Sequence, residues 1–207
     1  MKVKICGITN EDDAHAAIEA GAHALGFIFA DASPRCVAPG DVYNIIKTLP
    51  PFVTTVGVFV NSSREKVLRT IQATGIQAIQ FHGEESPEEL QGYFLPTYKA
   101  FRVDERFDVT SLQQYQSKIF LLDTFVDGVR GGTGKTFNWG IAIEAKRFGR
   151  VVLSGGLRPD NIAEAVRTVQ PYAIDVNSGV ESSPGKKDKQ KLKDLFSALC
   201  TTQEFAC

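Results

Sequence analysis

The sequence predicts an α/β protein folded as a single-domain (β/α)8 barrel, the TIM barrel. Short apolar runs alternate with amphipathic segments eight times, which is typical of parallel strands joined by helical crossovers. No linker or change of composition divides the 207 residues, and this length lies at the short end of the range for such barrels. An open, doubly wound sheet uses the same βα unit, but eight evenly spaced pairs favour the closed barrel.

The eight apolar runs are predicted to be the strands. Each is short and rich in apolar and β-branched residues, as expected of strands that are buried on both faces of a parallel sheet. In chain order they are residues 2–6, 24–29, 54–60, 78–81, 97–101, 119–123, 151–154 and 173–176.

The segments between the strands are predicted to be helices from their amphipathic character. In chain order they are residues 11–20, 39–48, 63–74, 87–93, 109–115, 138–148, 159–169 and 187–199. The side chains expected to cap helix N-termini are Asp41, Ser62 and Asn138, and the prolines expected in first turns are Pro39, Pro87 and Pro159.

One barrel domain is expected to span residues 1–200. Residues 201–207 follow the last helix without periodicity, so a flexible C-terminal tail is expected there. Within the domain, the glycine-rich residues 126–134 suit a mobile loop.

Composition argues against several classes of partner. The formal net charge is −1, and Lys and Arg are spread along the chain, so nothing indicates a surface for nucleic acid or an anionic membrane. No apolar run has the length of a signal peptide or of a membrane span. We expect a small-molecule partner and a monomer, since no stripe of exposed apolar residues indicates an interface.

The cysteines and histidines give no sign of a metal site. The four cysteines lie far apart in no metal-type spacing, and a reducing cytoplasm is their simplest setting. The three histidines, His15, His23 and His82, also lack ligand spacing, and His82 is interpreted as a structural residue. Residues 132–136 resemble a nucleotide-binding loop, but Val129 stands where that motif needs a glycine. Neither a metal nor a nucleotide cofactor is therefore expected.

The candidate site residues stand at strand ends, because in a barrel all strands point their C-terminal ends at the same face. The polar or glycine-rich positions there are Cys6 and Gly7, residues 31–35, Gln80, His82, Asp123, residues 154–156 and residues 175–179. We expect these residues to lie close together and form one site.

Glycines after the last two strands indicate a phosphate site. Gly155 and Gly156 follow one strand, and Ser178 and Gly179 follow the other, so backbone N–H groups can approach an anion closely. Taken singly, such glycines could equally serve only tight turns. The presence of both loops favours phosphate.

Cys6 and Asp123 are candidates for proton transfer. A lone cysteine is most often a small buried apolar residue. Cys6, however, ends a strand before a glycine, where Arg35 and helix N-termini are expected to lower the pKa of its thiol toward working pH. Asp123 ends an otherwise apolar strand, so a partly desolvated carboxyl could hold a proton to donate. The alternative for Asp123 is a helix or loop cap.

Six segments in order along the chain resemble the phosphoribosylanthranilate isomerase family. They read KICGIT at residues 4–9, GVFVN at 57–61, LLD at 121–123, GGTGKTF at 131–137, LSGGL at 153–157 and SGVE at 178–181. The resemblance extends from residue 1 to about residue 199. Several motifs in family order are far more specific than any single glycine pattern.

The resemblance implies a (β/α)8 barrel of tryptophan biosynthesis that acts without cofactor or metal. Its reaction is the Amadori rearrangement of N-(5′-phosphoribosyl)anthranilate to 1-(o-carboxyphenylamino)-1-deoxyribulose 5-phosphate. By resemblance, Asp123 protonates the ring oxygen of the sugar, and Cys6 then removes the proton from C2′ of the resulting Schiff base.

The resemblance also assigns substrate-binding residues. Arg35 matches the arginine near the anthranilate ring, whose carboxylate its guanidinium can pair with. The phosphate cradle matches Gly155, Gly156, Ser178 and Gly179, and Asp175 contacts the ribose or orders the loop. One departure is Cys36, where relatives often carry tyrosine, and we expect Cys36 to pack.

Three other functions are alternatives. A related isomerase of the histidine pathway uses an aspartate as base on the first strand, where this chain has Cys6. A non-catalytic phosphate-binding barrel would have lost the acid or the base, and both are present. A Schiff-base aldolase needs a desolvated lysine, and neither Lys4 nor Lys99 has a convincing sequence context.

Overall fold

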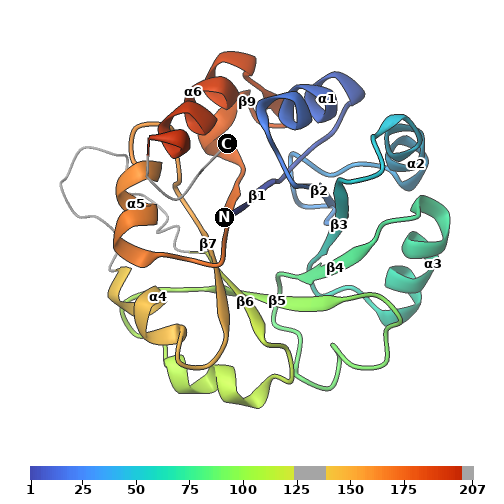
Figure 1. Ribbon diagram of the computed structural model, residues 1–207. Coiled ribbons are helices and arrows are strands. Elements are labelled where there is room, and N and C mark those ends of the chain that lie inside the picture. The colour runs from blue at the N-terminus through green and yellow to red at the C-terminus, as the bar shows by residue number, and fades with distance from the viewer. Residues whose placement is uncertain (124–138, 202–207) are drawn as a thin grey trace.

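The computed structural model describes residues 1–123 and 139–201, which form a closed barrel of eight parallel strands with helices around its outside (Figure 1). Each strand pairs with the next along the chain, and β1 (Lys2–Ile5) pairs with β8 (Ala173–Val176) to close the ring. An open sheet would leave these two strands as separate edges. The predicted fold class is therefore confirmed.

All eight predicted strands are present, each within one residue of its predicted ends. Besides β1 and β8 they are β2 (Ala24–Ile28), β3 (Thr54–Phe59), β4 (Ala78–Phe81), β5 (Thr97–Arg102), β6 (Ile119–Asp123) and β7 (Arg150–Ser154).

Six α-helices and two 3₁₀ helices lie among the described residues. They are α1 (Glu11–Ala20), α2 (Pro39–Thr48), α3 (Arg64–Thr74), η1 (Val109–Gln114), α4 (Trp139–Ala145), α5 (Ile162–Val169), η2 (Ser178–Val180) and α6 (Lys189–Cys200). Helices α1 and α2 have the predicted bounds. Asn10 caps α1 by accepting from the backbone of Asp13, and Gly21 ends it at φ 118°, a conformation that favours glycine.

The prediction of a helix at residues 87–93, with Pro87 in its first turn, is wrong. This part of the β4–β5 crossover forms turns, and Gly92 has φ 73°. Arg64 of α3 donates to the carbonyl oxygens of Gln91 and Gly92 at 2.8 and 2.6 Å, so a side chain takes up the acceptors that a helix would use. A seven-residue segment that begins with a proline also forms few intrahelical hydrogen bonds to offset the entropic cost of helix nucleation.

Four further helix predictions need correction. Residues 109–115 form the 3₁₀ helix η1 instead of an α-helix, closed by bonds such as Tyr115 N to Leu112 O at 3.2 Å. The N-caps of α2 and α3 are Ala38 and Ser63, so Asp41 and Ser62 are not caps, although Pro39 does open α2. Pro159 lies in the turn before α5, ahead of its N-cap Asn161.

The last helix begins two residues later than predicted, because Lys187 belongs to a hairpin. Strands β9 (Glu181–Ser183) and β10 (Lys186–Lys187) pair antiparallel between β8 and α6. Asp188 then caps α6 by accepting from the backbone of Gln190 and Lys191. The predicted cap Asn138, the glycine-rich residues 126–134, the segment 132–136 and the tail from residue 202 lie outside the described residues.

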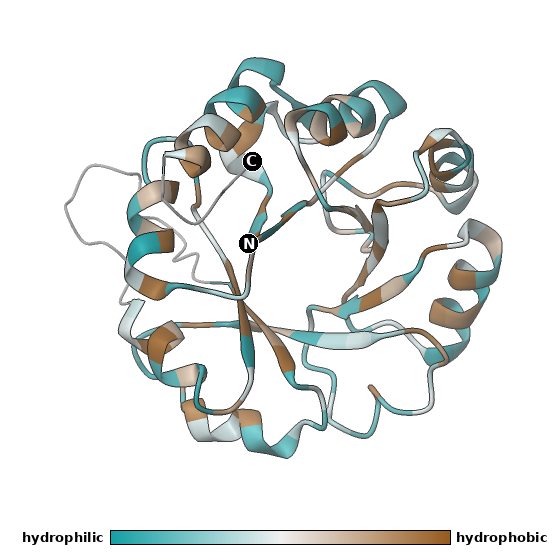
Figure 2. Cartoon of the chain, in the orientation of Figure 1, coloured by the Kyte–Doolittle hydropathy of each residue, from teal (hydrophilic) through white to brown (hydrophobic). Residues whose placement is uncertain are grey.

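The main hydrophobic core lies between the barrel and the helices. Fully buried aromatic rings line this layer, including Phe27, Phe59, Phe81 and Phe120. A smaller cluster, Ala100, Leu121, Val152 and Ala173, fills part of the barrel interior. Figure 2 shows brown on several strands and on the inner sides of several helices, and teal on much of the outer helix surface. The chain thus buries apolar area on both faces of the sheet.

Candidate active site

Alternation along β1 turns Lys4 and Cys6 into the barrel, while Val3 and Ile5 belong to the core layer outside it. Cys6 directly follows β1 and is 5% exposed. Its backbone N donates to the carbonyl oxygen of Val176, the last residue of β8, at 2.8 Å. The thiol is therefore fixed at the junction of the first and last strands.

A glycine on β2 makes room for the thiol. A Cβ atom added at Gly26 would lie 2.7 Å from Cys6 Sγ and 3.0 Å from Lys4 Nζ. The thiol and the ammonium group are thus neighbours in the space that Gly26 leaves open.

The pKa of the Cys6 thiol is raised, mainly by burial, and the charge of Lys4 opposes this shift. The sequence-based expectation of a lowered pKa is therefore wrong. Exposure could not be read from the sequence, and burial outweighs the nearby cations. The resting group is a thiol beside an ammonium group that favours its ionised form.

Asp175 forms a buried ion pair with Lys4. Nζ of Lys4 lies 2.8 Å from Oδ1 of Asp175, and the two side chains are 7% and 5% exposed. Burial alone would lower the pKa of Lys4, but the attraction of Asp175 and Cys6 outweighs it and raises that pKa. Lys4 therefore stays charged beside Cys6.

Asp123 ends β6 with its side chain 24% exposed. Nε2 of His82, which follows β4, lies 3.3 Å from Asp123 Oδ2, but this approach lacks hydrogen-bond geometry. Nδ1 of His82 contacts Gln80 Nε2 at 3.3 Å, and the Tyr98 hydroxyl donates to Gln80 Oε1 at 2.9 Å. A row of polar side chains thus leads from β5 through β4 to Asp123.

Sequence reasoning missed part of this row. Gln80 and His82 are among the strand-end positions expected at the site, but the interpretation of His82 as structural overlooks its place beside the candidate acid. Tyr98 was not singled out, because a tyrosine within a strand is an ordinary core residue. Tyr98 lies two residues before Ala100, which lies inside the barrel. Because residues two apart on a strand point to the same face, this spacing indicates that Tyr98 also points into the barrel.

The two glycine loops lie together at the ends of β7 and β8. Gly155 and Gly156 have φ of 87° and 62°, a region that favours glycine. A Cβ atom at Gly179 would collide with the carbonyl oxygen of Leu157, so the loop after β8 packs directly on the loop after β7. A Cβ atom at Gly156 would meet nothing within 4 Å, so open space adjoins the backbone there.

Arg35 lies across the end of β1. A Cβ atom at Gly7 would come within 2.9 Å of Arg35 Cδ and 2.6 Å of Asn177 Oδ1. The guanidinium of Arg35 pairs with Glu181, whose Oε2 accepts from Nη2 at 2.7 Å. The predicted residue Arg35 is thus present at the strand ends. Its neighbour Cys36 is exposed, contrary to the expectation that it packs.

Lys4 and Lys99, the lysines considered for a Schiff-base aldolase, are both in ion pairs. Lys99 Nζ lies 3.2 Å from Glu85 Oε2, and the side chains are 3% and 2% exposed. Lys4 is held by Asp175, as described above. Such buried ion pairs are typical of structural lysines and not of an amine nucleophile.

Residues 1–123 and 139–201 contain neither a metal-binding cluster nor a membrane-spanning helix. In these ranges, no three His, Cys, Asp or Glu side chains come together in a way that could hold a metal ion. The helices described there include none with both the length and the apolar character needed to cross a membrane.

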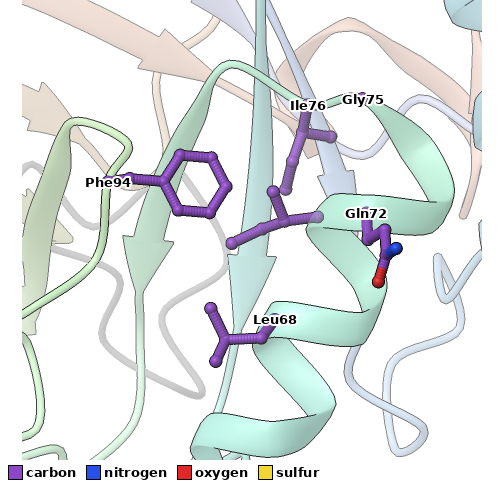
Figure 3. A pocket seen from close by; sticks show the side chains of 6 residues that line it. Leu68, Gln72, Gly75, Ile76 and Phe94 are labelled. Atoms are coloured by element: carbon purple, nitrogen blue, oxygen red, sulfur yellow. The ribbon is translucent and has the colours of Figure 1, made fainter.

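An apolar pocket lies elsewhere on the molecule (Figure 3). It is lined by Leu68, Ile71, Gln72, Gly75, Ile76 and Phe94. Ile76 and Phe94 precede β4 and β5, so the pocket lies toward the strands' N-terminal ends and away from the site.

A family model and a named relative indicate the same family for this chain. Residues 3–198 match the family model described as N-(5'-phosphoribosyl)anthranilate (PRA) isomerase. A relative from Pelobacter propionicus named N-(5'-phosphoribosyl)anthranilate isomerase is 48% identical over 196 residues, which cover 95% of this chain and 94% of the relative.

Solved structures agree. Phosphoribosyl anthranilate isomerase from Thermotoga maritima matches with a TM-score of 0.88 and 42% identity, covering 97% of this chain and 99% of that one. A second isomerase structure, in complex with reduced 1-(o-carboxyphenylamino)-1-deoxyribulose 5-phosphate, matches with a TM-score of 0.85 and 39% identity over the same shares.

Proposed function

The chain belongs to the phosphoribosylanthranilate isomerase family of tryptophan biosynthesis, and we propose that it performs the family's Amadori rearrangement with Asp123 as general acid and Cys6 as general base. The observation that carries the proposal is the position of Cys6, a thiol next to a buried ammonium group at the end of β1.

In the first step, Asp123 donates its proton to the furanose ring oxygen, and the C1′–O bond breaks to give a Schiff base. The location of Asp123 at the end of β6, with its side chain partly buried, supports this role. His82 beside it can stabilise the carboxylate that remains after proton transfer.

In the second step, Cys6 removes the proton from C2′ to give an enolamine, which tautomerises to the ketose. Only the thiolate can accept this proton. Lys4 supplies a fixed positive charge beside Cys6 that favours the thiolate, although burial raises the pKa of the thiol.

The substrate has two anionic ends. We propose that backbone N–H groups around Gly155, Gly156, Ser178 and Gly179 bind the phosphate, and the contact between the two glycine loops supports this role. At the other end, Arg35 pairs with the anthranilate carboxylate. Asp175 acts mainly by holding Lys4, since its Oδ1 is bound by that ammonium group.

Three further expectations are part of the proposal. The chemistry needs no cofactor or metal, because one acid and one base suffice. The chain is proposed to act in the cytoplasm and as a monomer. A Thermotoga maritima relative of 36% identity is described as dimeric, with monomers generated from it, so sedimentation of the purified chain tests the last expectation.

The first test follows phosphoribosylanthranilate generated in the cuvette by its fluorescence decay. We expect fast turnover by the parent protein, and losses of roughly 10²-fold or more in kcat for Cys6→Ser and for Asp123→Asn. Cys200→Ser and Asp12→Asn make the same exchanges at exposed positions and should keep parental rates.

Parental turnover in Cys6→Ser or Asp123→Asn would contradict the role given to that residue. Decay no faster than the spontaneous rate in the parent would contradict the proposed reaction. The aminoaldose of the histidine pathway would then be assayed under the same conditions.

A further inference from the structure

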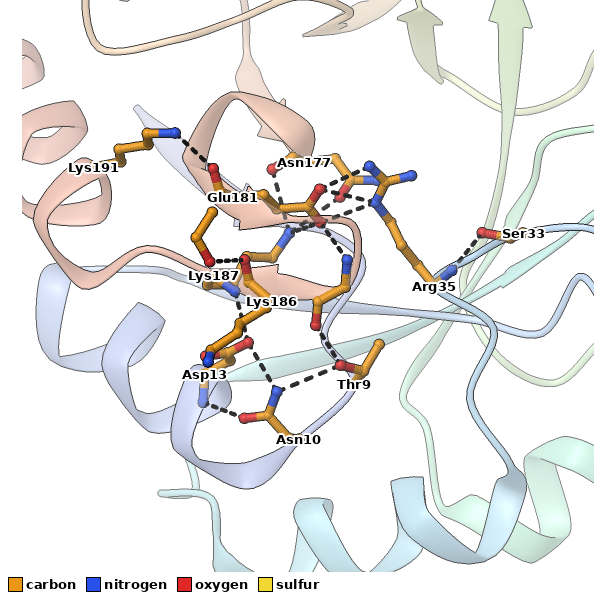
Figure 4. A network of polar contacts seen from close by, with 12 residues as sticks. Thr9, Asn10, Asp13, Ser33, Arg35, Asn177, Glu181, Lys186, Lys187 and Lys191 are labelled. Atoms are coloured by element: carbon orange, nitrogen blue, oxygen red, sulfur yellow. Dashed lines mark hydrogen bonds and ion pairs between the residues drawn. The ribbon is translucent and has the colours of Figure 1, made fainter.

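One edge of the Arg35 guanidinium is held by Glu181 (Figure 4). Nε donates to Oε1 and Oε2 of Glu181 at 2.9 and 3.1 Å, and Nη2 donates to Oε2 at 2.7 Å. The Glu181 side chain is 4% exposed and that of Arg35 is 19% exposed. Burial alone would raise the pKa of Glu181, but the bonds from Arg35 and Lys187 outweigh it and lower that pKa. Glu181 is therefore a charged, fully engaged carboxylate.

Lys187 holds Glu181 from the other side. Its Nζ donates to Oε1 of Glu181 at 3.0 Å, and to Oδ1 and O of Asn177 at 3.1 and 3.3 Å. The Lys187 side chain has no exposed surface. An ammonium group has three donors, and these three acceptors use all of them.

The β9–β10 hairpin sets this arrangement. Lys187 stands opposite Glu181 in the hairpin register. The backbone N of Lys187 donates to Asp13 at 2.7 Å, and Lys191 of α6 donates to the carbonyl oxygen of Glu181 at 2.6 Å. Both residues are thus tied to α1 and α6, so the carboxylate of Glu181 has a fixed place.

The cluster of Arg35, Glu181 and Lys187 contains two cations and one anion. It therefore carries one positive charge that no member balances. Lys187 has no donor left to offer a ligand, whereas Nη1 of Arg35 donates to no acceptor among the described residues. In Figure 4 the remaining nitrogen of the guanidinium points away from Glu181. The donors left for a ligand are therefore at one end of the guanidinium.

The Arg35 side chain lies close to Cys6, the proposed base. The Arg35 side chain passes over Gly7, the residue after Cys6. A carboxylate on an aromatic ring attached to the sugar nitrogen can meet the free end of the guanidinium there. Its two oxygens match the planar, forked geometry of the donor.

We propose that Glu181, held by Lys187, is a positioning residue that aims Arg35 at the substrate's aromatic carboxylate, and that the cluster's unbalanced positive charge makes the enzyme select carboxylate-bearing substrates. This rests on the proposed function, in which Arg35 binds that carboxylate. Without Glu181, the Arg35 and Lys187 cations repel each other and Arg35 leaves its place.

The test compares two substrates, phosphoribosylanthranilate and the analogue made from aniline, which lacks the carboxylate. For Glu181→Gln with the anthranilate substrate, we expect KM to rise roughly tenfold or more, and kcat to change by less than about threefold. With the aniline analogue, parent and variant should have the same kcat/KM. Glu65→Gln, whose carboxylate makes an exposed ion pair with Arg69, is the matched control and should equal the parent on both substrates.

A second variant tests the inference if Glu181→Gln does not fold. Lys187→Met leaves Arg35 and Glu181 as a neutral pair, so the preference for anthranilate over aniline should fall by about the same factor. Equal losses on both substrates, in either folded variant, would show that the cluster only supports the hairpin and would overturn the inference. Absence of turnover in the parent would instead overturn the proposed function, and the inference with it.

Discussion

Groups around Cys6 shift the pKa of its thiol in opposite directions. Burial raises its pKa, Lys4 and Lys187 favour the thiolate, and Asp175 opposes it. Lys4 has the largest favourable effect because it is both charged and in contact. The pKa of the proposed base is thus influenced most favourably by a lysine two residues before it.

A pH profile follows from the raised pKa of Cys6. The thiolate fraction should grow as pH rises, so kcat/KM should increase from pH 7 through at least pH 9, the ordinary value for a thiol. Lys4→Met should move this rise to higher pH and lower kcat/KM at pH 7 by about tenfold per pKa unit. Lys2→Met, which removes an exposed lysine from the same strand, is the control. An unchanged profile in Lys4→Met would contradict the role of Lys4.

Gly26 should be needed for its lack of a side chain. In Gly26→Ala the new methyl would meet Cys6 Sγ at 2.7 Å, so the thiol must move, and kcat should fall by roughly 10²-fold. Gly40 in α2 has nothing within 4 Å, so Gly40→Ala should keep full activity and gain up to about 1 kcal/mol of stability. Steady-state kinetics of both variants are the measurement. Full activity in Gly26→Ala would refute the steric argument.

Among the elements, the β4–β5 crossover differs from the other described crossovers because it contains no helix. Aromatic packing covers the sheet instead. Tyr93 packs on Phe81 with ring centres 5.6 Å apart, and Tyr115 of the following crossover donates to the carbonyl oxygen of Glu85 at 3.1 Å. Glu85 ties this segment to the barrel, since its carboxylate accepts from the backbone of Asn61 and Gly83.

Glu85 should therefore be important for stability. Glu85→Gln leaves Lys99 buried without a counter-charge, and we expect a loss of about 3–5 kcal/mol in the free energy of unfolding. Urea denaturation measures this loss, with the exposed neighbour Glu84→Gln as control. A loss below about 1 kcal/mol would mean that the backbone bonds alone hold the crossover.

The elements also show what a sequence can predict. The eight strands were found within one residue because strands buried on both faces are continuous apolar runs. The ends of the strands then gave Cys6, Asp123 and Arg35 as candidates. The environment of Cys6 was missed, because its burial depends on tertiary packing. The pairing of Arg35 with Glu181 was missed because residues 146 positions apart meet only in the closed barrel.

At the scale of the whole molecule, an ion pair reinforces the backbone pairing that closes the barrel. Lys4 and Asp175 are partners in the register of β1 and β8, and their side chains join across that seam. Cys6 adds a backbone bond to Val176 at the same place. The seam between the first and last strands is therefore also one wall of the proposed active site.

Breaking the pair should weaken the whole barrel. Asp175→Asn leaves the Lys4 ammonium group buried with a neutral partner, and we expect a loss of about 3–5 kcal/mol in the free energy of unfolding. Denaturation followed by circular dichroism measures the loss, with Asp12→Asn as the exposed control. Unchanged stability would mean that backbone pairing closes the barrel without help from this pair.

The helix-free β4–β5 crossover makes one region of the barrel wall suitable for protein engineering. Residues 91, 92 and 94 are exposed, and they lie on the path from the end of β4 to the start of β5. Connections of this kind tolerate inserted chain when few buried contacts cross them. A peptide epitope or a small reporter domain spliced here would project into solvent, which offers a way to immobilise or label the enzyme without altering the strands that carry its chemistry.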